Sequence, residues 1–203
     1  MFWDKVAGVY DLFVNIVNRK THKKLKQLIA KMIYPKDEVL ECACGTGLLT
    51  AVIAGRCQKL TATDFSAKML EKARKNCKAF NNVEFAKADI TKLPYEDDSF
   101  DVVVAGNVIH LLDDPYSALN ELKRVCKKDG RLIIATYMNK DKNGKSSLFS
   151  ETLGKAGADF KRQFTIGSYR SFFEEAGFHD IEISLAEGLI PCAIALMKNE
   201  EEG

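Results

Sequence analysis

The sequence predicts an α/β protein with a doubly wound, mostly parallel sheet that ends in a β-hairpin. From residue 36 onward, short apolar segments alternate with segments of helical period, which indicates a parallel sheet covered by helices on both faces. The last two apolar segments have no helix-length segment between them, so their strands must run antiparallel. The 203 residues suit one domain over 1–203.

The first expected element is a helix within an N-terminal helical cap, which we expect to cover residues 1–35. Leu25, Leu28, Ile29 and Met32 follow the helical period. The same helix carries six basic residues: Arg19, Lys20, Lys23, Lys24, Lys26 and Lys31. They fit a solvated face over a buried stripe, or a surface that attracts an anionic substrate or a membrane.

The central part of the chain is expected to supply five parallel strands and three helices. The strands are expected at 39–41, 60–64, 83–88, 100–105 and 132–136, and the first two helices at 48–56 and 67–77. The third helix has Asp114 as its N-cap and Pro115 at its first position. Gly130 is expected to end it. Its expected buried face is Ala118, Leu119, Leu122 and Val125.

After the fifth strand the regular alternation stops. Residues 139–163 are polar and contain three glycines, and a long excursion at this edge of a sheet is typical of a lid over a site. A helix is expected at 168–176, closed by Gly177. Strands at 181–184 and 193–197 then form the terminal hairpin.

Composition narrows the classes of function. A formal net charge of +2 argues against a dedicated nucleic-acid-binding protein. No apolar run is long enough for a membrane span and no secretory signal is visible, so we expect a cytoplasmic protein. The six cysteines include no CxxC pair, which favours free buried thiols over disulfides or a metal site.

The stretch "VLECACGTGLLT" (residues 39–50) predicts a cofactor turn between a strand and a helix. Gly45 and Gly47 would let the backbone approach a ligand at the helix N-terminus. Asp64 ends the next strand, where a carboxylate can accept both hydroxyls of a ribose. This pattern fits a dinucleotide or S-adenosylmethionine (SAM), although Thr50 stands where a dinucleotide fingerprint has its third glycine.

A second carboxylate discriminates between these cofactors. Asp89 follows the third strand in "ADITKLPYEDDSFDVVVAGNVIHLLDDP", where it can accept a hydrogen bond from an adenine amino group. With "ECACGTG", "ATDFSAKMLEKAR" and "ELKRVCKKDGRLIIAT", the chain resembles the class I SAM-dependent methyltransferases, of the small-molecule subfamily called type 11 that includes the ubiquinone/menaquinone C-methyltransferases. The resemblance implies a Rossmann-like seven-stranded sheet with a reversed last strand, and methyl transfer that leaves S-adenosylhomocysteine.

The resemblance also implies how the cofactor is held. Gly45 and Gly47 would face its methionine part and Asp64 its ribose, with Phe65 and Met69 flanking the adenine. Further expected contacts are Asp89 and the Ile90 amide at the adenine edge, Asn107 under the methyl group, Glu41 near the ammonium group and Tyr10 folded over the cofactor. The family usually has glycine where this chain has Ala43, which narrows the approach of the backbone.

The acceptor side is less well defined. His110, in "GNVIHLL" after the fourth strand, is a candidate general base near the methyl group, or a structural histidine without a chemical role. Tyr137 is a second candidate for the acceptor pocket, whereas His22 and His179 are expected on the surface. Apart from a small-molecule methyltransferase, two functions stay open: a nicotinamide-dependent oxidoreductase and a SAM-binding protein without activity.

Overall fold

A computed structural model describes residues 18–138 and 161–200 of the chain. The expected lid lies almost entirely outside the described residues, as does Tyr10. The helices are α2 (Arg19–Lys31), α3 (Thr50–Ala54), α4 (Ala67–Asn76), the 3-10 helix η1 (Ile109–Leu111), α5 (Pro115–Val125) and α7 (Ile166–Glu175). The strands are β1 (Glu38–Cys42), β2 (Lys59–Asp64), β3 (Val83–Lys87), β4 (Phe100–Gly106), β5 (Cys126–Tyr137), β6 (Ile181–Ala186) and β7 (Cys192–Lys198).

The predicted sheet is confirmed, including its reversed last strand. Seven strands form one sheet in the order β3-β2-β1-β4-β5-β7-β6. Neighbours from β3 to β5 pair in parallel, and only β7 runs against its neighbours β5 and β6. The strand order reverses between β1 and β4, which is the point where open α/β sheets bind ligands at the carboxyl ends of the strands.

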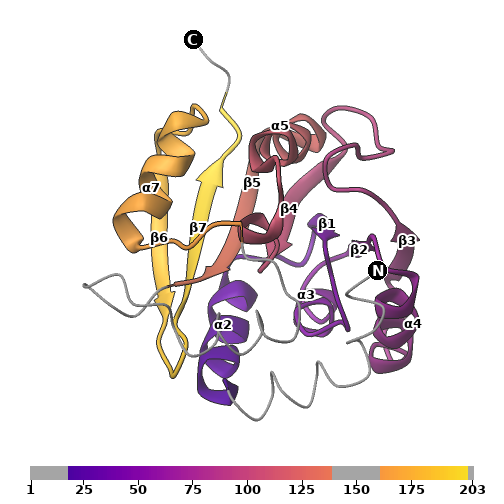
Figure 1. Cartoon of the computed structure of the whole chain (residues 1–203). Helices are drawn as coiled ribbons and strands as arrows, with labels where there is room; N and C mark the ends of the chain where they lie inside the picture. Colours follow the sequence, from indigo (N-terminus) through magenta and orange to yellow (C-terminus); the bar gives the residue numbers. More distant parts are fainter. Residues whose placement is uncertain (1–17, 139–160, 201–203) are drawn as a thin grey trace.

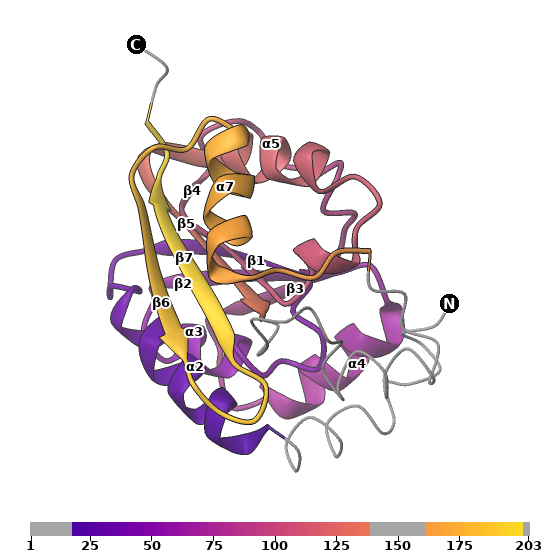
Figure 2. The ribbon, with the colours of Figure 1, turned by 60° about the vertical axis from the view of Figure 1, so that its left-hand side comes forward.

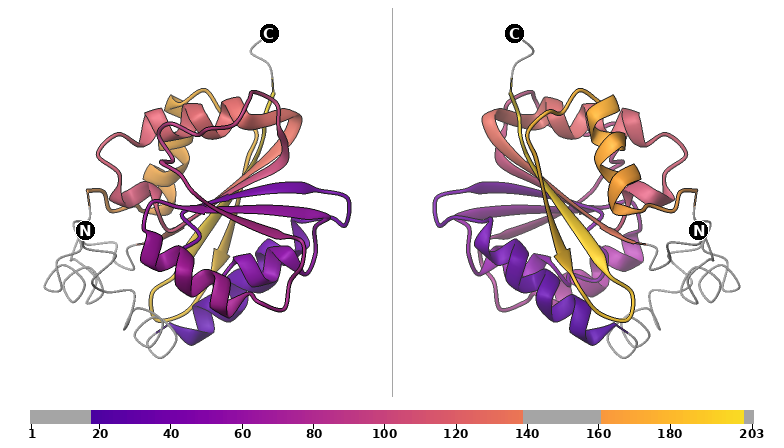
Figure 3. Two further views of the ribbon diagram at one scale, coloured as in Figure 1. Left: turned by 90° about the vertical axis from the view of Figure 1, so that its right-hand side faces the viewer. Right: turned by 90° about the vertical axis from the view of Figure 1, so that its left-hand side faces the viewer.

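Helices cover both faces of this sheet, with α2, α3 and α4 on one side and α5 and α7 on the other (Figures 1 and 3). Each layer has its own apolar core. Leu25 and Ile29 of α2 pack with Ile53 of α3, while Leu119 and Phe173 pack in the core under α5 and α7. The central strands β1, β4 and β7 are largely buried on both faces, as is typical of strands covered on both sides.

Local hydrogen bonds explain where the helices begin. The Asp114 carboxylate accepts a bond from the Ser117 amide and Pro115 takes the first position, as predicted. Thr165 and Ser168 form a reciprocal capping box, so α7 begins at Ile166, two residues before the predicted start. Among the described helices, none combines the length and apolar character needed to cross a bilayer.

Two expected helix boundaries are wrong. The helix predicted at 48–56 is only Thr50–Ala54, because Gly45 and Gly47 take positive φ values in the turn before it. The prediction that Gly130 ends α5 also fails, since α5 ends at Val125 and β5 begins at the next residue. Gly130 instead lies inside β5, where a Cβ would overlap the Lys127 carbonyl and the Cys126 sulfur.

The start of α2 is held by the terminal hairpin, whose turn lies beside it (Figure 2). The Asn18 side chain donates a hydrogen bond to the Ile190 carbonyl at 2.8 Å and accepts one from the Ile190 amide. A Cβ at Gly188 would overlap Thr21, so the turn approaches the helix backbone closely. This contact fixes which face of α2 is buried.

Candidate active site

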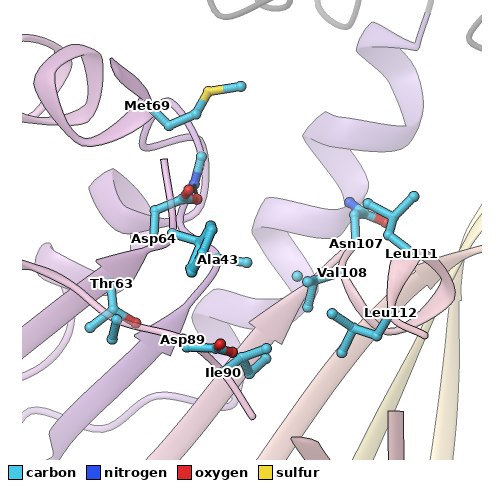
Figure 4. Close-up of a pocket in the computed structure, with 14 residues that line it drawn as sticks. Ala43, Thr63, Asp64, Met69, Asp89, Ile90, Asn107, Val108, Leu111 and Leu112 are labelled. Carbon is cyan, nitrogen blue, oxygen red and sulfur yellow. Dashed lines mark hydrogen bonds between the residues drawn. The ribbon is translucent and has the colours of Figure 1, made fainter. Parts of the chain in front are cut away.

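A cavity of about 320 Å³ opens at the carboxyl ends of the central strands. Eight predicted site residues line it: Ala43, Gly45, Asp64, Phe65, Met69, Asp89, Ile90 and Asn107. In Figure 4, Asp64 and Ala43 lie on one side, Asn107 and Leu111 on the other, and Asp89 below. The sequence prediction therefore brought together residues from four strand ends at one cavity.

The glycine turn and Asp64 are joined by hydrogen bonds. The Gly45 amide donates to one carboxylate oxygen of Asp64 and the Ser66 amide to the other, each at 2.8 Å. Gly45 has φ +57, and a Cβ there would meet nothing within 4 Å. The backbone therefore holds the Asp64 carboxylate in place at the cavity wall.

Gly47 has a different role from Gly45. It does not line the cavity, and its φ of +92 brings it against α4, where a Cβ would lie 2.9 Å from the Cys77 sulfur. The Gly47 amide donates to the Cys44 carbonyl at 3.0 Å. Gly47 thus packs the turn against α4, and Gly45 forms the surface that a ligand would contact.

Two of the four residues predicted on the adenine side, Phe65 and Asp89, are exposed at the ends of strands. Phe65 keeps 48% of its surface exposed, and the Lys87 ammonium lies 5.5 Å from its ring centroid. One oxygen of Asp89 accepts bonds from the Thr91 amide and hydroxyl, at 2.9 and 2.7 Å. These contacts orient the carboxylate while its second oxygen can serve a ligand.

Glu41 lies beneath the glycine turn and does not line the cavity. Its carboxyl group is 2% exposed and accepts a hydrogen bond from the Thr50 hydroxyl at 2.6 Å. Burial raises the pKa of Glu41 to about 8, an effect that the Thr50 bond partly offsets and the nearby Asp64 charge reinforces. In the free protein this group is therefore protonated at neutral pH.

Asn107 lies at the end of β4, on the side of the cavity where the methyl acceptor is expected. It takes φ +55, a conformation that asparagine tolerates better than most residues. Its amide donates to the Ala135 carbonyl at 2.8 Å, and its side-chain oxygen lies 3.6 Å from the Cys192 sulfur. Sequence reasoning missed the apolar wall that follows, made by Val108, Leu111 and Leu112. The signal was the apolar letters in "GNVIHLL", which η1 turns toward the cavity.

His110 does not line the cavity. It is 4% exposed, and its Nδ1 lies 3.4 Å from the Thr136 hydroxyl. Burial lowers the pKa of His110 to about 4, so the ring is neutral at physiological pH. The ring centroids of His110 and Tyr137 lie 6.4 Å apart.

The expected surface position of His22 is wrong. His22 is 3% exposed, and its Nε2 lies 2.7 Å from the Tyr137 hydroxyl. The reason is the contact between α2 and the hairpin, which turns this face of the helix inward. His179 is exposed, as expected, and all six cysteines are free and buried.

Comparisons with known proteins agree with this geometry. The sequence profile of the methyltransferase domain (Methyltransf_11) matches residues 40–134. A demethylmenaquinone methyltransferase from Clavibacter sepedonicus is 32% identical over 137 residues, covering 66% of this chain and 56% of that protein. A malonyl-acyl-carrier protein O-methyltransferase from Halalkalibacterium halodurans is 38% identical over 144 residues, covering 66% and 53%. The chain thus spans little more than half the length of these relatives.

Solved structures share the fold. A SAM-dependent methyltransferase from Thermotoga maritima superposes with a TM-score of 0.73 at 22% identity, covering 98% of this chain and 99% of that one. The cyclase SpnF superposes with a TM-score of 0.71 at 17% identity, covering 88% of this chain and 81% of that one. Family and fold support SAM as the cofactor. Residues 40–134 therefore match a methyltransferase domain, and the described residues have the fold of SAM-dependent methyltransferases.

Proposed function

We propose that the protein transfers a methyl group from SAM to a small-molecule acceptor. The observation that carries this proposal is the cavity in which Asp64 and Asp89, from neighbouring strand ends, lie beside the Gly45 turn. Two carboxylates at the ends of adjacent strands suit a ligand with a ribose and an exocyclic amine. The small-molecule acceptor is supported by the names of the relatives.

SAM supplies an electrophilic methyl group on a sulfonium, and an acceptor nucleophile would displace the thioether in line. The positive charge leaves the sulfur and passes to the acceptor, or is cancelled if the acceptor is an anion, so the protein has no oxyanion to stabilise. Its contribution is to position the acceptor against the methyl group in a site that excludes water. The apolar wall of Val108, Leu111 and Leu112 suits that task.

We assign the residues of the site as follows. Asp64 holds the ribose, Phe65 and Met69 flank the adenine, and Asp89 with the Ile90 amide binds its edge. Gly45 and Ala43 face the methionine part, Gly47 supports the turn, and Glu41 lies near the ammonium group. Asn107 lies under the methyl group and Tyr10 closes over the cofactor. His110 is either the general base where the acceptor must lose a proton or a structural histidine, a role that its position outside the cavity lining favours. The proposed cap (1–35) and lid (139–163) belong to the same single domain.

Isothermal titration calorimetry and a methylation screen test this function in two steps. We expect S-adenosylhomocysteine to bind and reduced nicotinamide cofactors not to bind. Radiolabelled SAM, offered with a panel of phenols, thiols, amines and quinone precursors, should then transfer its methyl group to at least one acceptor. Binding without transfer would favour a protein that holds SAM without methylating.

We also propose a peripheral membrane contact through α2 and a cytoplasmic location. Arg19, Lys20 and Lys23 are exposed on α2, and Leu189 in the adjacent hairpin turn is 62% exposed. A basic face beside an exposed apolar side chain suits an anionic lipid surface. Six free buried thiols suit a reducing compartment. Sedimentation with anionic but not zwitterionic vesicles, reduced in Lys20→Glu/Lys23→Glu, would support the membrane contact, and equal sedimentation would refute it.

A further inference from the structure

Among the residues that the structure describes, Asn107 is the one polar side chain on the acceptor side of the cavity. Three other polar side chains line the cavity, and each has a contact or an assigned role. Asp64 and Asp89 are assigned to the cofactor, and the Thr63 hydroxyl donates to the Glu41 carbonyl at 3.1 Å. Asn107 lies on the opposite side of the cavity from Asp64, beside the apolar wall described above (Figure 4).

The side-chain amide of Asn107 is held at its oxygen end. Its Oδ1 lies 3.6 Å from the Cys192 sulfur. Cys192 is fully buried, and burial raises the pKa of its thiol well above the usual value, so the sulfur keeps its proton and can donate it. The Ala193 carbonyl is 3.7 Å from the same sulfur, but it lies in β7 between two paired strands, where backbone carbonyls are already bonded. The thiol proton therefore goes to Asn107 Oδ1.

The other end of this amide, the nitrogen Nδ2, faces the cavity as a hydrogen-bond donor. Within residues 18–138 and 161–200 it has no hydrogen-bond partner, and the one buried side-chain nitrogen or oxygen without a partner there is His22 Nδ1. Asn107 Nδ2 is therefore an accessible atom. Because Asn107 is half-buried and lines the cavity, this nitrogen opens into the cavity. It carries two N–H groups and no lone pair for a hydrogen bond, so it can only donate.

A donor at this place discriminates between kinds of acceptor. An oxygen, above all an ionised one, has lone pairs for the Asn107 N–H groups, whereas the N–H groups of an amine would be set against them. The described residues that line the cavity include no Lys, Arg or His. The positive charge that balances an oxygen anion would therefore come from the SAM sulfonium, and the apolar wall would hold the rest of the acceptor.

We propose that the Asn107 amino group binds the oxygen anion of an apolar acceptor and thereby selects oxygen nucleophiles over amines. This assignment rests on the proposed function and narrows its class of acceptor. Attack by the anion forms the C–O bond as the C–S bond breaks, the electron pair leaves with the sulfur, and the two opposite charges cancel. Asn107 is then a specificity residue, because it distinguishes an oxygen from an amino group on molecules of the same shape.

Three probes of one shape test this inference: 4-nitrophenol, 4-nitroaniline and 4-nitrotoluene. They share a ring and a nitro group and differ in one substituent, which accepts as an oxygen anion, donates as an amino group, or does neither. Each is titrated into the full chain saturated with S-adenosylhomocysteine, which has no methyl group to transfer. At a pH where 4-nitrophenol is ionised, we expect it to bind about tenfold more tightly than the other two, the scale of a hydrogen bond to a charged group.

Variants of Asn107 then locate the contact. Asn107→Asp keeps the shape of the side chain and its tolerance of the positive φ, but places an oxygen where the amino group was. It should lose about tenfold or more in affinity for 4-nitrophenolate, favour 4-nitroaniline and bind 4-nitrotoluene as before. Asn107→Gly removes the donor without straining the backbone and should raise the pKa of bound 4-nitrophenol, read from its absorbance, by about one pH unit. Asn120→Asp makes the same exchange on the exposed face of α5 and should change none of these affinities.

Failure of this inference is distinct from failure of the proposed function. If the wild-type chain binds S-adenosylhomocysteine but takes 4-nitrophenolate no better than 4-nitrotoluene, or not at all, Asn107 does not select oxygen. Unchanged affinity for 4-nitrophenolate in Asn107→Asp leads to the same conclusion. A wild-type preference for 4-nitroaniline would mean that the amide presents its oxygen to the cavity and its nitrogen to Cys192, which also overturns the proposal. If the wild-type chain does not bind S-adenosylhomocysteine at all, the proposed function itself fails.

Discussion

The two sides of the cavity solve different problems with different chemistry. On the cofactor side, Asp64 and Asp89 are carboxylates whose orientation is fixed by hydrogen bonds from nearby amides. On the acceptor side the wall is apolar, made by Val108, Leu111 and Leu112, and burial lowers the pKa of the nearby His110 to about 4, so that this ring is neutral. The cofactor side is built to attract polar groups, whereas the acceptor side is built to stay dry.

This difference suits the reaction that we propose. A cofactor with a fixed structure can be held by fixed charges, which supply affinity. Methyl transfer spreads the sulfonium charge over the sulfur and the acceptor, or partly cancels it, on the way to the transition state, so a neutral and apolar surface near the methyl group opposes it least. The predictions below test whether charge is confined to the cofactor side.

The largest effect should come from His110→Ala. If the acceptor must lose a proton, removing the base should lower turnover about 10²–10⁴-fold and leave S-adenosylhomocysteine affinity nearly unchanged. Because the lowered pKa of about 4 keeps the base form available above that pH, the rising limb of the wild-type pH–rate profile should lie near pH 4 and vanish in the variant. Wild-type turnover with the same profile would remove His110 from the mechanism.

Glu41→Gln tests the one buried acid on the cofactor side. Since the pKa of Glu41 rises from 4.5 to about 8, the folded state holds its proton over this range while the unfolded chain loses it. The Glu41 contribution to the free energy of unfolding is therefore complete below pH 4.5 and is lost as pH rises to 8. Urea titrations measure the free energy of unfolding of both proteins at pH 5 and at pH 8. Between these pH values the difference should shift in favour of the variant by about 1–4 kcal/mol, at about 1.4 kcal/mol per pKa unit.

The wild type must be compared with Glu41→Gln at each pH because His22 and His110 change the stability in the opposite direction to Glu41 as the pH rises. Their lowered pKa values make stability rise with pH between about 4 and 6.5 in both proteins, so their effect cancels in the difference. Glu71→Gln, on the exposed face of α4, is the control. An equal gain in both variants would mean that Glu41 is not the source.

Asp64→Ala should weaken S-adenosylhomocysteine binding by roughly 1–3 kcal/mol, the scale of lost charge-assisted hydrogen bonds. Calorimetry measures the affinity. A thermal melt of the variant measures how much stability is lost with the hydrogen bonds from the Gly45 and Ser66 amides. Asp180→Ala, at an exposed position before β6, should bind as the wild type does. Unchanged affinity in Asp64→Ala would mean that charge does not define the cofactor side.

The smallest effect is expected from Ala43→Gly. Ala43 has φ +55, a conformation that costs an alanine about 1 kcal/mol and a glycine much less. The variant should therefore gain up to about 1 kcal/mol in urea unfolding, and bind S-adenosylhomocysteine at least as well. Ala88→Gly, which also lines the cavity but has no positive φ, should lose stability. A loss of stability in both variants would contradict the idea that the positive φ of Ala43 is strained.

The sequence predicted the cofactor side well because its residues occupy strand ends. Asp64 and Asp89 end or follow buried strands that are recognisable from local pattern, and parallel strands bring their carboxyl ends together. The same logic placed Asn107 at the cavity. The expected start of the next helix was less accurate, because the positive φ values of the glycine turn delay it.

Other features could not be predicted because they depend on contacts between elements that are distant in the sequence. His22 lies among basic residues on a helix, and only its contact with the hairpin turns it inward. Leu111 and Leu112 reach the cavity because η1 folds back after β4, and such a short 3-10 turn has no periodicity to detect. Gly130 looked like a helix end, but it lies in the irregular part of β5 where the register against β4 shifts.

The contact between Asn18 and Ile190 spans 172 residues of sequence, and this separation has a kinetic consequence. During synthesis α2 leaves the ribosome long before the hairpin that holds it, so its buried face, with Leu25 and Ile29, must wait without that partner. Closing such a long loop is slow relative to local structure. We therefore expect α2 to dock in a late folding step, so that ribosome-bound chains that stop before β7 would expose it to chaperones.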